Sequence, residues 1–304
     1  MAGQSNKPGF DLSGCTTALI TPFRNGRLDT AGLRANVRFQ LSNGISGLLV
    51  AGSTGEAASL TRDEWDRAVS TVVSEVKARV RVVVGAGTNS TQKSVAAVRR
   101  AKKLGGDAAL VVAPYYVRPT QEGLYRHFRT IAEAVDIPIV VYNIPGRTAV
   151  NIAPATVERM VRACSNIVAV KEASGNVDNT TELCVRCGDR LTVLSGDDSL
   201  TLPILAAGGR GVVSVVSNIV PTDVESMLAA HFASQTARAT AMHQELYPLV
   251  KALFVETNPI PVKAAMSMLG MAAGEPRLPL TPLSASGRKV VRRALRNHGL
   301  KPRR

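Results

Sequence analysis

The chain has 304 residues, of which 45% are apolar and 20% charged. This composition supports a large buried core and excludes a disordered or fibrous protein. No stretch approaches the roughly 20 apolar residues that span a bilayer, and the polar segment 1–11 lacks the apolar centre of a signal peptide. We therefore expect a cytoplasmic protein with no membrane partner.

The formal net charge of +14 is typical of nucleic-acid-binding proteins, but its distribution argues against that class. Eight Lys or Arg residues and no acidic residue lie in segment 288–304. No nucleic-acid-binding motif accompanies them, and aromatic residues make up only 4% of the chain. We interpret the segment as a solvated basic helix with a loose end and expect no nucleic-acid partner.

Eight short apolar runs recur along the chain, and most are rich in β-branched residues. Continuous apolar runs of this length are typical of parallel strands that are buried on both faces. The runs are 17–21, 47–51, 80–85, 108–113, 137–142, 167–171, 191–195 and 211–215.

Amphipathic segments separate these runs. The first starts with a helix-capping pattern, Thr61 followed by Glu64, and continues with apolar residues at helical spacing. Helical patterns also cover 90–104, 120–135 and 154–164, and later 237–255, 260–269 and 284–297.

This alternation predicts an α/β fold, a closed (β/α)8 TIM barrel over residues 10–235 with a C-terminal helical region over 236–304. An open doubly wound sheet is the alternative. It would normally carry a phosphate-binding turn, and the nearest candidate, 85–90, has Ser90 where the third glycine belongs.

The four cysteines offer no obvious metal site. Cys184 and Cys187 form a lone CxxC pair with no second pair and no nearby histidine, and the four histidines are scattered. We expect buried free thiols in a reducing compartment and no metal ion.

Lys171 ends the run 167–171, and active sites of TIM barrels lie at the C-terminal ends of the strands. Apolar surroundings lower the pKa of a lysine, and the neutral amine attacks carbonyl groups to form Schiff bases. The alternative is an ion-paired lysine, with Glu172 as the partner. Tyr142 ends the run 137–142, and its phenol can exchange protons during imine formation, although a core tyrosine is equally compatible with this position.

Two loops offer groups that bind carboxylates. Segment 52–56, Gly-Ser-Thr-Gly-Glu, can turn its backbone N–H groups towards an anion, with the hydroxyls of Ser53 and Thr54 as further donors. Arg147 follows Tyr142 in the loop 143–148, and a guanidinium suits a carboxylate, although a surface salt bridge is the alternative.

Six motifs together make the sequence resemble the dihydrodipicolinate synthase and N-acetylneuraminate lyase superfamily, over residues 10–300. They are Gly-Ser-Thr-Gly-Glu at 52–56, Pro-Tyr-Tyr at 114–116, Tyr-Asn-Ile-Pro-Gly-Arg-Thr at 142–148, Val-Lys-Glu-Ala-Ser-Gly at 170–175, Ser-Gly-Asp-Asp at 195–198 and the segment 254–263, which contains Asn-Pro-Ile-Pro-Val-Lys.

The resemblance implies a class I lyase that condenses pyruvate with L-aspartate 4-semialdehyde in lysine and diaminopimelate biosynthesis. It makes Lys171 the Schiff-base lysine and Tyr142 the proton donor and acceptor. Ser53 and Tyr116 complete the proton relay, with Tyr116 supplied by a neighbouring subunit. Ser53 departs from the more usual threonine but keeps the hydroxyl.

The resemblance further implies that Thr54 and Val213 hold pyruvate and that Arg147 binds the carboxylate of the semialdehyde. No cofactor is implied beyond the covalent pyruvate imine on Lys171. The family also implies a homotetramer built as a dimer of dimers.

Feedback inhibition by lysine is expected to be weak or absent. Lysine-inhibited relatives have a histidine where Arg62 stands and a glutamate where Lys93 stands, whereas Asn89 and Tyr115 match them. Two added positive charges repel a cationic effector.

Two other functions stay open. One is a different Schiff-base aldolase of the superfamily, either N-acetylneuraminate lyase or a 2-keto-3-deoxy sugar acid aldolase. The other is an inactive barrel that acts as a binding or regulatory protein, which the basic C-terminal segment favours and the three residues Lys171, Tyr142 and Arg147 oppose.

Overall fold

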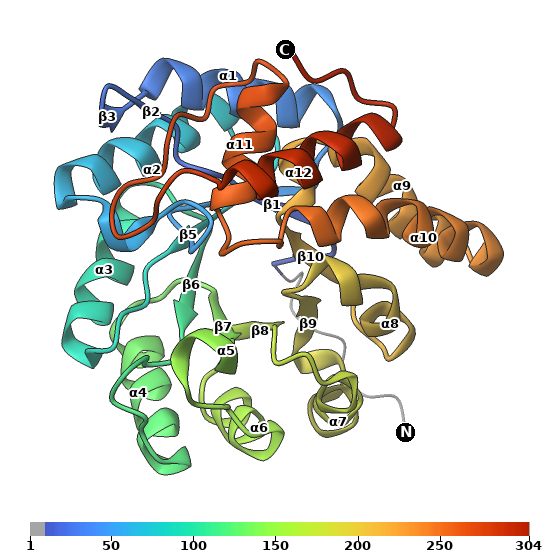
Figure 1. Cartoon of the computed structure of the whole chain (residues 1–304). Coiled ribbons are helices and arrows are strands. Elements are labelled where there is room, and N and C mark those ends of the chain that lie inside the picture. Colours follow the sequence, from blue (N-terminus) through green and yellow to red (C-terminus); the bar gives the residue numbers. More distant parts are fainter. Residues whose placement is uncertain (1–9, 304) are drawn as a thin grey trace.

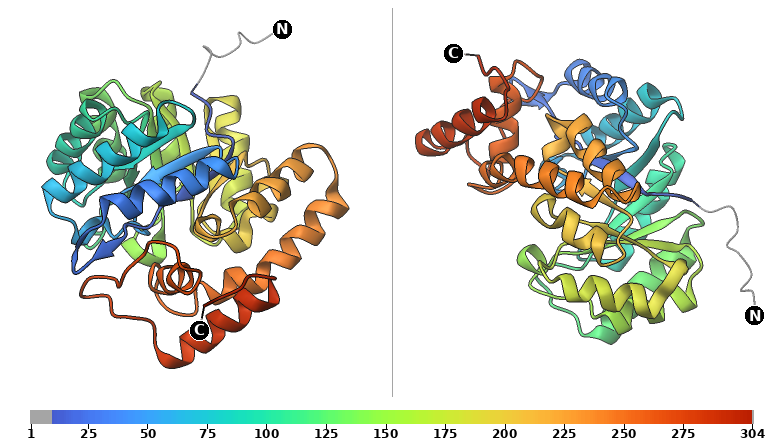
Figure 2. Two further views of the ribbon diagram at one scale, coloured as in Figure 1. Left: turned by 90° about the horizontal axis from the view of Figure 1, so that it is seen from above. Right: turned by 90° about the vertical axis from the view of Figure 1, so that its right-hand side faces the viewer.

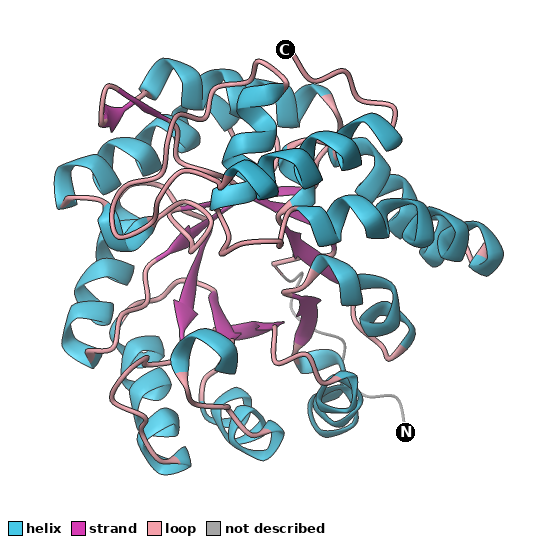
Figure 3. Ribbon diagram, viewed as in Figure 1, coloured by secondary structure: helices cyan, strands magenta, loops and turns pink. Residues whose placement is uncertain are grey.

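A computed structural model describes residues 10–303, so most of the polar N-terminal segment and the last residue of the basic segment lie outside the described part. Eight parallel strands close into a barrel, and helices surround them (Figure 3). In order around the ring the strands are β1 (Gly14–Ala18), β4 (Gly47–Val50), β5 (Arg81–Gly85), β6 (Ala108–Val112), β7 (Ile139–Asn143), β8 (Ile167–Glu172), β9 (Thr192–Ser195) and β10 (Gly211–Ser214). The predicted TIM barrel is confirmed.

The strands are apolar on successive residues because both of their faces are buried. On β7, Ile139 and Val141 pack outwards in the main core, whereas Val140 and Tyr142 belong to a second cluster inside the barrel. Because alternate residues point inwards, side chains fill the interior of the barrel. The C-terminal ends of the strands therefore lie directly above a packed core.

The predicted first strand, 17–21, is wrong by three residues, since β1 begins at Gly14 and ends at Ala18. Gly14 and Thr16 interrupt the apolar pattern at the start of the strand, so the predicted run begins only at Thr17. Thr17 is fully buried, and its hydroxyl forms hydrogen bonds with Gln40 and Ser217 at 2.7 and 2.8 Å. Satisfied hydroxyls can therefore stand in a buried strand.

Helices follow the strands in the barrel (Figure 1). They are α1 (Thr30–Ser42), α2 (Arg62–Val76), α3 (Thr91–Lys103), α4 (Gln121–Ala134), α5 (Pro145–Thr148), α6 (Pro154–Ala163), α7 (Val177–Cys187), α8 (Thr201–Ala206) and α9 (Pro221–Phe232). A hairpin of β2 (Phe23–Arg24) and β3 (Arg27–Leu28) follows β1. The predicted capping box is confirmed, because Thr61 caps α2 and the Glu64 carboxylate accepts from the Thr61 backbone N–H.

Three helices form the C-terminal region, α10 (Thr236–Ala252), α11 (Ile260–Met268) and α12 (Ala285–Asn297), and they lie together on one side of the barrel (Figure 2). The predicted division after residue 235 falls between α9 and α10, and a separate role for the two parts stays a prediction. On α12, Val291 and Leu295 are fully buried. The expected loose end is wrong as far as Arg303, whose backbone N–H donates to the carbonyl oxygen of Met268 at 2.7 Å.

In the described part of the chain, none of the helices combines the length and the apolar character that crossing a membrane requires. The four cysteines are free thiols. Cys15, Cys164 and Cys187 are buried as expected, whereas Cys184 is half-buried.

Candidate active site

Lys171 and Tyr142 are neighbours at the C-terminal ends of β8 and β7. The strand register pairs the two residues, and Nζ of Lys171 lies 4.3 Å from the centroid of the Tyr142 ring. The C-terminal ends of the strands form the face of a TIM barrel that carries its active sites. The structure therefore brings the expected amine and phenol together at that face.

Burial gives the Lys171 amine its chemistry. The side chain is only 5% exposed, and desolvation lowers its pKa to about 7. The carboxylate of Asp198 raises the pKa and the guanidinium of Arg147 lowers it, both by smaller amounts. A large fraction of the amine is therefore neutral near pH 7 and can attack a carbonyl carbon.

The alternative ion pair between Lys171 and Glu172 does not form. The Glu172 carboxylate instead accepts from Asn143 Nδ2 at 3.0 Å and from the Ser174 backbone N–H at 2.6 Å. Within residues 10–303, the Lys171 amine takes part in no ion pair or hydrogen bond.

Gly196 makes room for the lysine side chain. A Cβ atom at this position would lie 2.7 Å from the Cβ of Ala173 and 3.1 Å from Cε of Lys171. Because both contacts are tighter than ordinary packing allows, any larger residue would push the Lys171 side chain aside. The sequence motif contained Gly196, but its role is visible only in the fold.

Tyr142 is suited to hold a proton. Burial raises the pKa of its phenol to about 12, while Arg147 and a side-chain hydrogen bond with Ser53 oppose this rise. The phenol is therefore protonated at neutral pH, and Ser53 lies close enough to affect its pKa. A protonated phenol beside a hydroxyl is suited to give and take a proton.

The turn Gly52–Glu56 follows β4 and presents donors to an anion. Its backbone is closed by a hydrogen bond from the Glu56 N–H to the Ser53 carbonyl oxygen at 3.1 Å. Within residues 10–303, the N–H groups of Ser53 and Thr54 have no hydrogen-bond acceptor. Two free adjacent N–H groups next to two hydroxyls form a site for a carboxylate.

Arg147 lies on α5, and its guanidinium donates to the carbonyl oxygen of Asn258 at 2.9 Å. The same asparagine donates from Nδ2 to Oγ1 of the buried Thr54 at 3.0 Å. Asn258, to which the sequence motif 254–263 assigned no role, thus bridges the two predicted carboxylate-binding residues.

A cleft of about 660 Å³ opens on this side of the barrel, and its lining includes Ser53, Tyr142 and Arg147. Further along, Arg62 and Lys93 line the same cleft. Lys171 is not itself part of the lining, but its amine lies 4.3 Å from the ring centroid of Tyr142, which is. A small keto acid and a second, larger substrate can be accommodated in such a volume.

Of the other predicted site residues, Thr54, Val213 and Tyr116 are also not part of the cleft lining. Val213 is buried on β10 in the cluster inside the barrel, together with Tyr142. Tyr116 is 87% exposed and has a φ of +73°, a conformation that costs a bulky residue about 1–3 kcal/mol. Within one chain, the structure therefore does not bring Tyr116 to the other site residues.

Asp198 is another residue whose role the sequence did not reveal. It is buried after β9, and one carboxylate oxygen accepts from the backbone N–H groups of Val215 and Val216 at 2.8 and 3.1 Å. The other oxygen has no hydrogen-bond partner among the described residues. The carboxylate fixes the end of β10 and at the same time raises the pKa of Lys171.

No group of three or more His, Cys, Asp or Glu side chains gathers around a common point in residues 10–303.

Comparison with known proteins matches this architecture. The curated 4-hydroxy-tetrahydrodipicolinate synthase of Syntrophus aciditrophicus is 46% identical over 289 residues, which cover 95% of this chain and 99% of the relative. The crystal structure of dihydrodipicolinate synthase from Aquifex aeolicus superposes with a TM-score of 0.95 at 44% identity, covering 96% and 100% of the two chains. A structure of the enzyme from Cyanidioschyzon merolae with lysine bound gives 0.92 at 41% identity, covering 95% and 98%.

The sequence model described as the Dihydrodipicolinate synthetase family matches residues 11–298. This match spans the barrel and nearly all of the C-terminal region, and it includes each residue of the site described above. The chain belongs to the Dihydrodipicolinate synthetase family.

Proposed function

We propose that the chain is a 4-hydroxy-tetrahydrodipicolinate synthase, a lyase that joins pyruvate to L-aspartate 4-semialdehyde through a Schiff base on Lys171. The observation that carries this proposal is the buried amine of Lys171, whose pKa is about 7 and whose Nζ lies over the ring of Tyr142. The curated relatives of similar length bear this name.

In the first half of the reaction, the neutral amine attacks the keto carbon of pyruvate and gives a carbinolamine. The phenol of Tyr142 donates a proton to the leaving hydroxyl, water departs and the imine forms. The turn Gly52–Glu56 supports this step, because the free N–H groups and hydroxyls of Ser53 and Thr54 bind the pyruvate carboxylate. Val213 packs against the bound keto acid from inside the barrel.

In the second half, the imine loses a proton from its methyl carbon and becomes an enamine. The enamine carbon attacks the aldehyde carbon of the semialdehyde and forms the new carbon–carbon bond. The amino group of the semialdehyde then attacks the imine carbon and displaces Lys171, so that the ring closes and the enzyme is regenerated. Arg147 faces the cleft and binds the semialdehyde carboxylate.

The proton relay in this proposal extends beyond one chain. Tyr142 is linked to Ser53, and the third hydroxyl, Tyr116, is exposed on its own chain. A second chain that packs against this surface can bring its own Tyr116 to the site. We include in the proposal a homotetramer built from two such dimers, in the cytoplasm, with no cofactor other than the pyruvate imine.

The test is a comparison of second substrates. With pyruvate and L-aspartate 4-semialdehyde we expect a cyclic product that a dihydrodipicolinate reductase consumes with oxidation of NADPH, which is followed by absorbance. Cleavage of N-acetylneuraminate or of 2-keto-3-deoxy sugar acids to pyruvate is measured in parallel. Rapid cleavage of a sugar acid together with no turnover of the semialdehyde would contradict the proposal.

A further inference from the structure

The turn Gly52–Glu56 is anchored at Glu56, which combines an unusual backbone with a buried charge. Its φ of +51° lies in the left-handed region, which residues other than glycine seldom occupy. The residue is only 5% exposed. A positive φ and a buried charge both cost free energy. The groups that bind the Glu56 carboxylate must therefore hold the turn in place.

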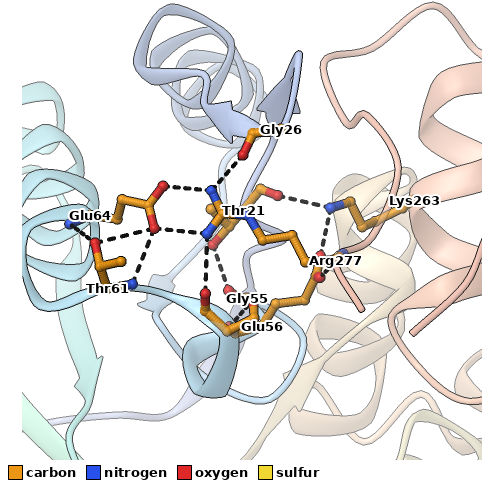
Figure 4. Close-up of polar contacts among 9 residues, drawn as sticks. Thr21, Gly26, Gly55, Glu56, Thr61, Glu64, Lys263 and Arg277 are labelled. Atoms are coloured by element: carbon orange, nitrogen blue, oxygen red, sulfur yellow. Dashed lines mark hydrogen bonds and ion pairs between the residues drawn. The ribbon is translucent and has the colours of Figure 1, made fainter. Parts of the chain in front are cut away.

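Those partners come from the C-terminal region. The Glu56 carboxylate accepts from Nζ of Lys263 at 2.5 Å, and its second oxygen accepts from the backbone N–H of Arg277 at 2.9 Å (Figure 4). The Lys263 and Glu56 side chains are 1% and 2% exposed. More than 200 residues of chain separate the two members of this ion pair, so it joins α11 to the active-site turn.

Lys263 also holds the turn by a second route. Its amine donates to the carbonyl oxygen of Thr21 at 3.1 Å, and the Thr21 hydroxyl donates to the carbonyl oxygen of Gly55 at 2.6 Å. Gly55 and Glu56 are thus both held by one buried amine.

The two residues that precede Gly55 and Glu56 in the chain are those proposed to bind pyruvate. Ser53 and Thr54 carry the free N–H groups and the hydroxyls that face a carboxylate, and the Ser53 carbonyl oxygen accepts from the Glu56 N–H. A shift of Glu56 therefore moves Ser53 directly. Asn258 adds a third link from the C-terminal region, through its hydrogen bond to Thr54.

We propose that Lys263 and Glu56 are positioning residues for pyruvate, which hold the turn Gly52–Glu56 in its carboxylate-binding conformation. This inference rests on the proposed function. Arg147 is held through the carbonyl oxygen of Asn258, and within residues 10–303 it has no hydrogen bond with Lys263 or Glu56. Loss of the pair should thus weaken pyruvate capture and leave capture of the second substrate unchanged.

A neighbouring ion pair provides the matched control. Arg277 binds Glu64 through two hydrogen bonds of 2.7 and 2.5 Å, and its guanidinium lies 4.1 Å from the centroid of the Phe23 ring. The Lys263 amine lies 4.3 Å from the same ring. Both pairs tie the C-terminal region to the barrel, but within residues 10–303 the Arg277 side chain forms no hydrogen bond with the turn Gly52–Glu56.

The experiment compares Lys263→Met and Arg277→Met in the full-length protein. Trapping of the pyruvate imine with borohydride is measured by mass spectrometry at increasing pyruvate concentrations, and thermal unfolding is followed in the same samples. We expect both variants to unfold at lower temperature. Only Lys263→Met should need about 10- to 100-fold more pyruvate for half-maximal trapping, the effect expected when a binding group is displaced by about 1 Å.

A double variant separates positioning from folding. Lys263→Met together with Glu56→Gln leaves no unpaired buried charge, so its unfolding temperature should recover towards that of the wild type. The pyruvate requirement should stay high, because the link to Thr21 is still missing. Unchanged pyruvate dependence in Lys263→Met, an equal rise in Arg277→Met, or recovery of pyruvate affinity along with stability in the double variant would each overturn the inference.

Trapping requires pyruvate alone, so the identity of the second substrate does not affect this result. Where turnover is measurable, the KM for the semialdehyde should stay the same in Lys263→Met. Absence of trapping in the wild type would contradict the proposed function itself and is thereby distinguishable from failure of this inference.

Discussion

Lys171 acquires its reactivity from the place where the fold puts it. The amine is buried at the end of a strand, and its nearest acidic neighbour in sequence, Glu172, is engaged by Asn143 and Ser174. Desolvation is therefore the main cause of the lowered pKa, and Asp198 moderates it. We expect the balance between these two effects to set the pH at which the neutral amine becomes available.

The pH dependence of imine formation follows from this balance. The rate of borohydride-trapped adduct formation should rise with pH and reach half of its plateau near pH 7, because only the neutral amine attacks pyruvate. In Asp198→Asn the midpoint should move to lower pH, since a charge that favours the ammonium form is removed. An unchanged or higher midpoint in this variant would contradict the electrostatic account.

Arg147 should determine capture of the second substrate. Arg147→Met removes a charge-assisted hydrogen bond, and we expect kcat/KM for the semialdehyde to fall about 10- to 100-fold. The pyruvate dependence of imine trapping should stay nearly constant, because Arg147 lies outside the turn Gly52–Glu56, which we propose binds the pyruvate carboxylate. Steady-state kinetics with each substrate varied in turn check this separation.

Regulation by lysine is predicted at the far part of the cleft, where Arg62, Lys93 and Tyr115 lie. The acidic lining residue Asp66 already binds Arg100 through hydrogen bonds of 2.8 and 2.5 Å. The positive charges of Arg62 and Lys93 therefore repel the ammonium groups of lysine, and this lining offers no free carboxylate to bind them.

Wild-type enzyme assayed at sub-millimolar lysine should keep nearly all of its activity, and calorimetry should detect little binding. The double variant Arg62→His with Lys93→Glu should gain lysine binding. Strong inhibition of the wild type would refute this prediction.

At the scale of helices and strands, the alternation of apolar runs and amphipathic segments was sufficient to predict the barrel. Seven of the eight predicted strands overlap closely with observed ones, because buried parallel strands leave continuous apolar runs. The start of β1 was missed because Gly14 and Thr16 interrupt the apolar pattern ahead of the predicted run, which begins at Thr17.

The residues of the site that could be predicted are those that lie at the ends of predicted strands. Lys171 and Tyr142 could be found because each ends an apolar run, and the ends of parallel strands meet. Asn258, Glu56 and Lys263 lie in two of the sequence motifs, but their roles could not be predicted, because their partners are distant in sequence and no local pattern relates them.

The ion pair of Glu64 and Arg277 joins the N-terminus of α2 to the C-terminal region, and it makes stability depend on pH. The Arg277 guanidinium lowers the pKa of Glu64 from 4.5 to about 2. A lowered folded-state pKa stabilises the protein fully above pH 4.5, and this stabilisation is lost as the pH falls towards 2.

Glu64→Gln should therefore lower the free energy of unfolding by about 2–3 kcal/mol at neutral pH. The difference from the wild type should shrink as the pH falls below 4.5, which urea titrations at several pH values measure. A difference that stays constant on acidification would show that the charge of Glu64 is not the source of the effect.

At the scale of the whole molecule, one described chain leaves the proposed relay incomplete. Tyr116 is 87% exposed and held in a costly backbone conformation. Strained, exposed residues of this kind are often kept for function. The proposed dimer supplies a reason, because each subunit completes the site of the other.

Subunit mixing tests that proposal. Tyr116→Phe alone and Lys171→Ala alone should both be nearly inactive. Co-expressed, the two variants should form mixed dimers in which one site combines an intact Lys171 with an intact Tyr116, so activity should return. Activity no greater than the sum of the separate variants, in mixed oligomers verified by mass spectrometry, would contradict a shared site.

The central claim is that the amine of Lys171 forms a covalent imine with pyruvate. The most direct measurement is incubation with pyruvate, reduction with borohydride and identification of the modified residue by peptide mass spectrometry. The account predicts one reduced pyruvate adduct, on Lys171, that is absent from Lys171→Ala. An unmodified chain, or an adduct on another lysine, would contradict it.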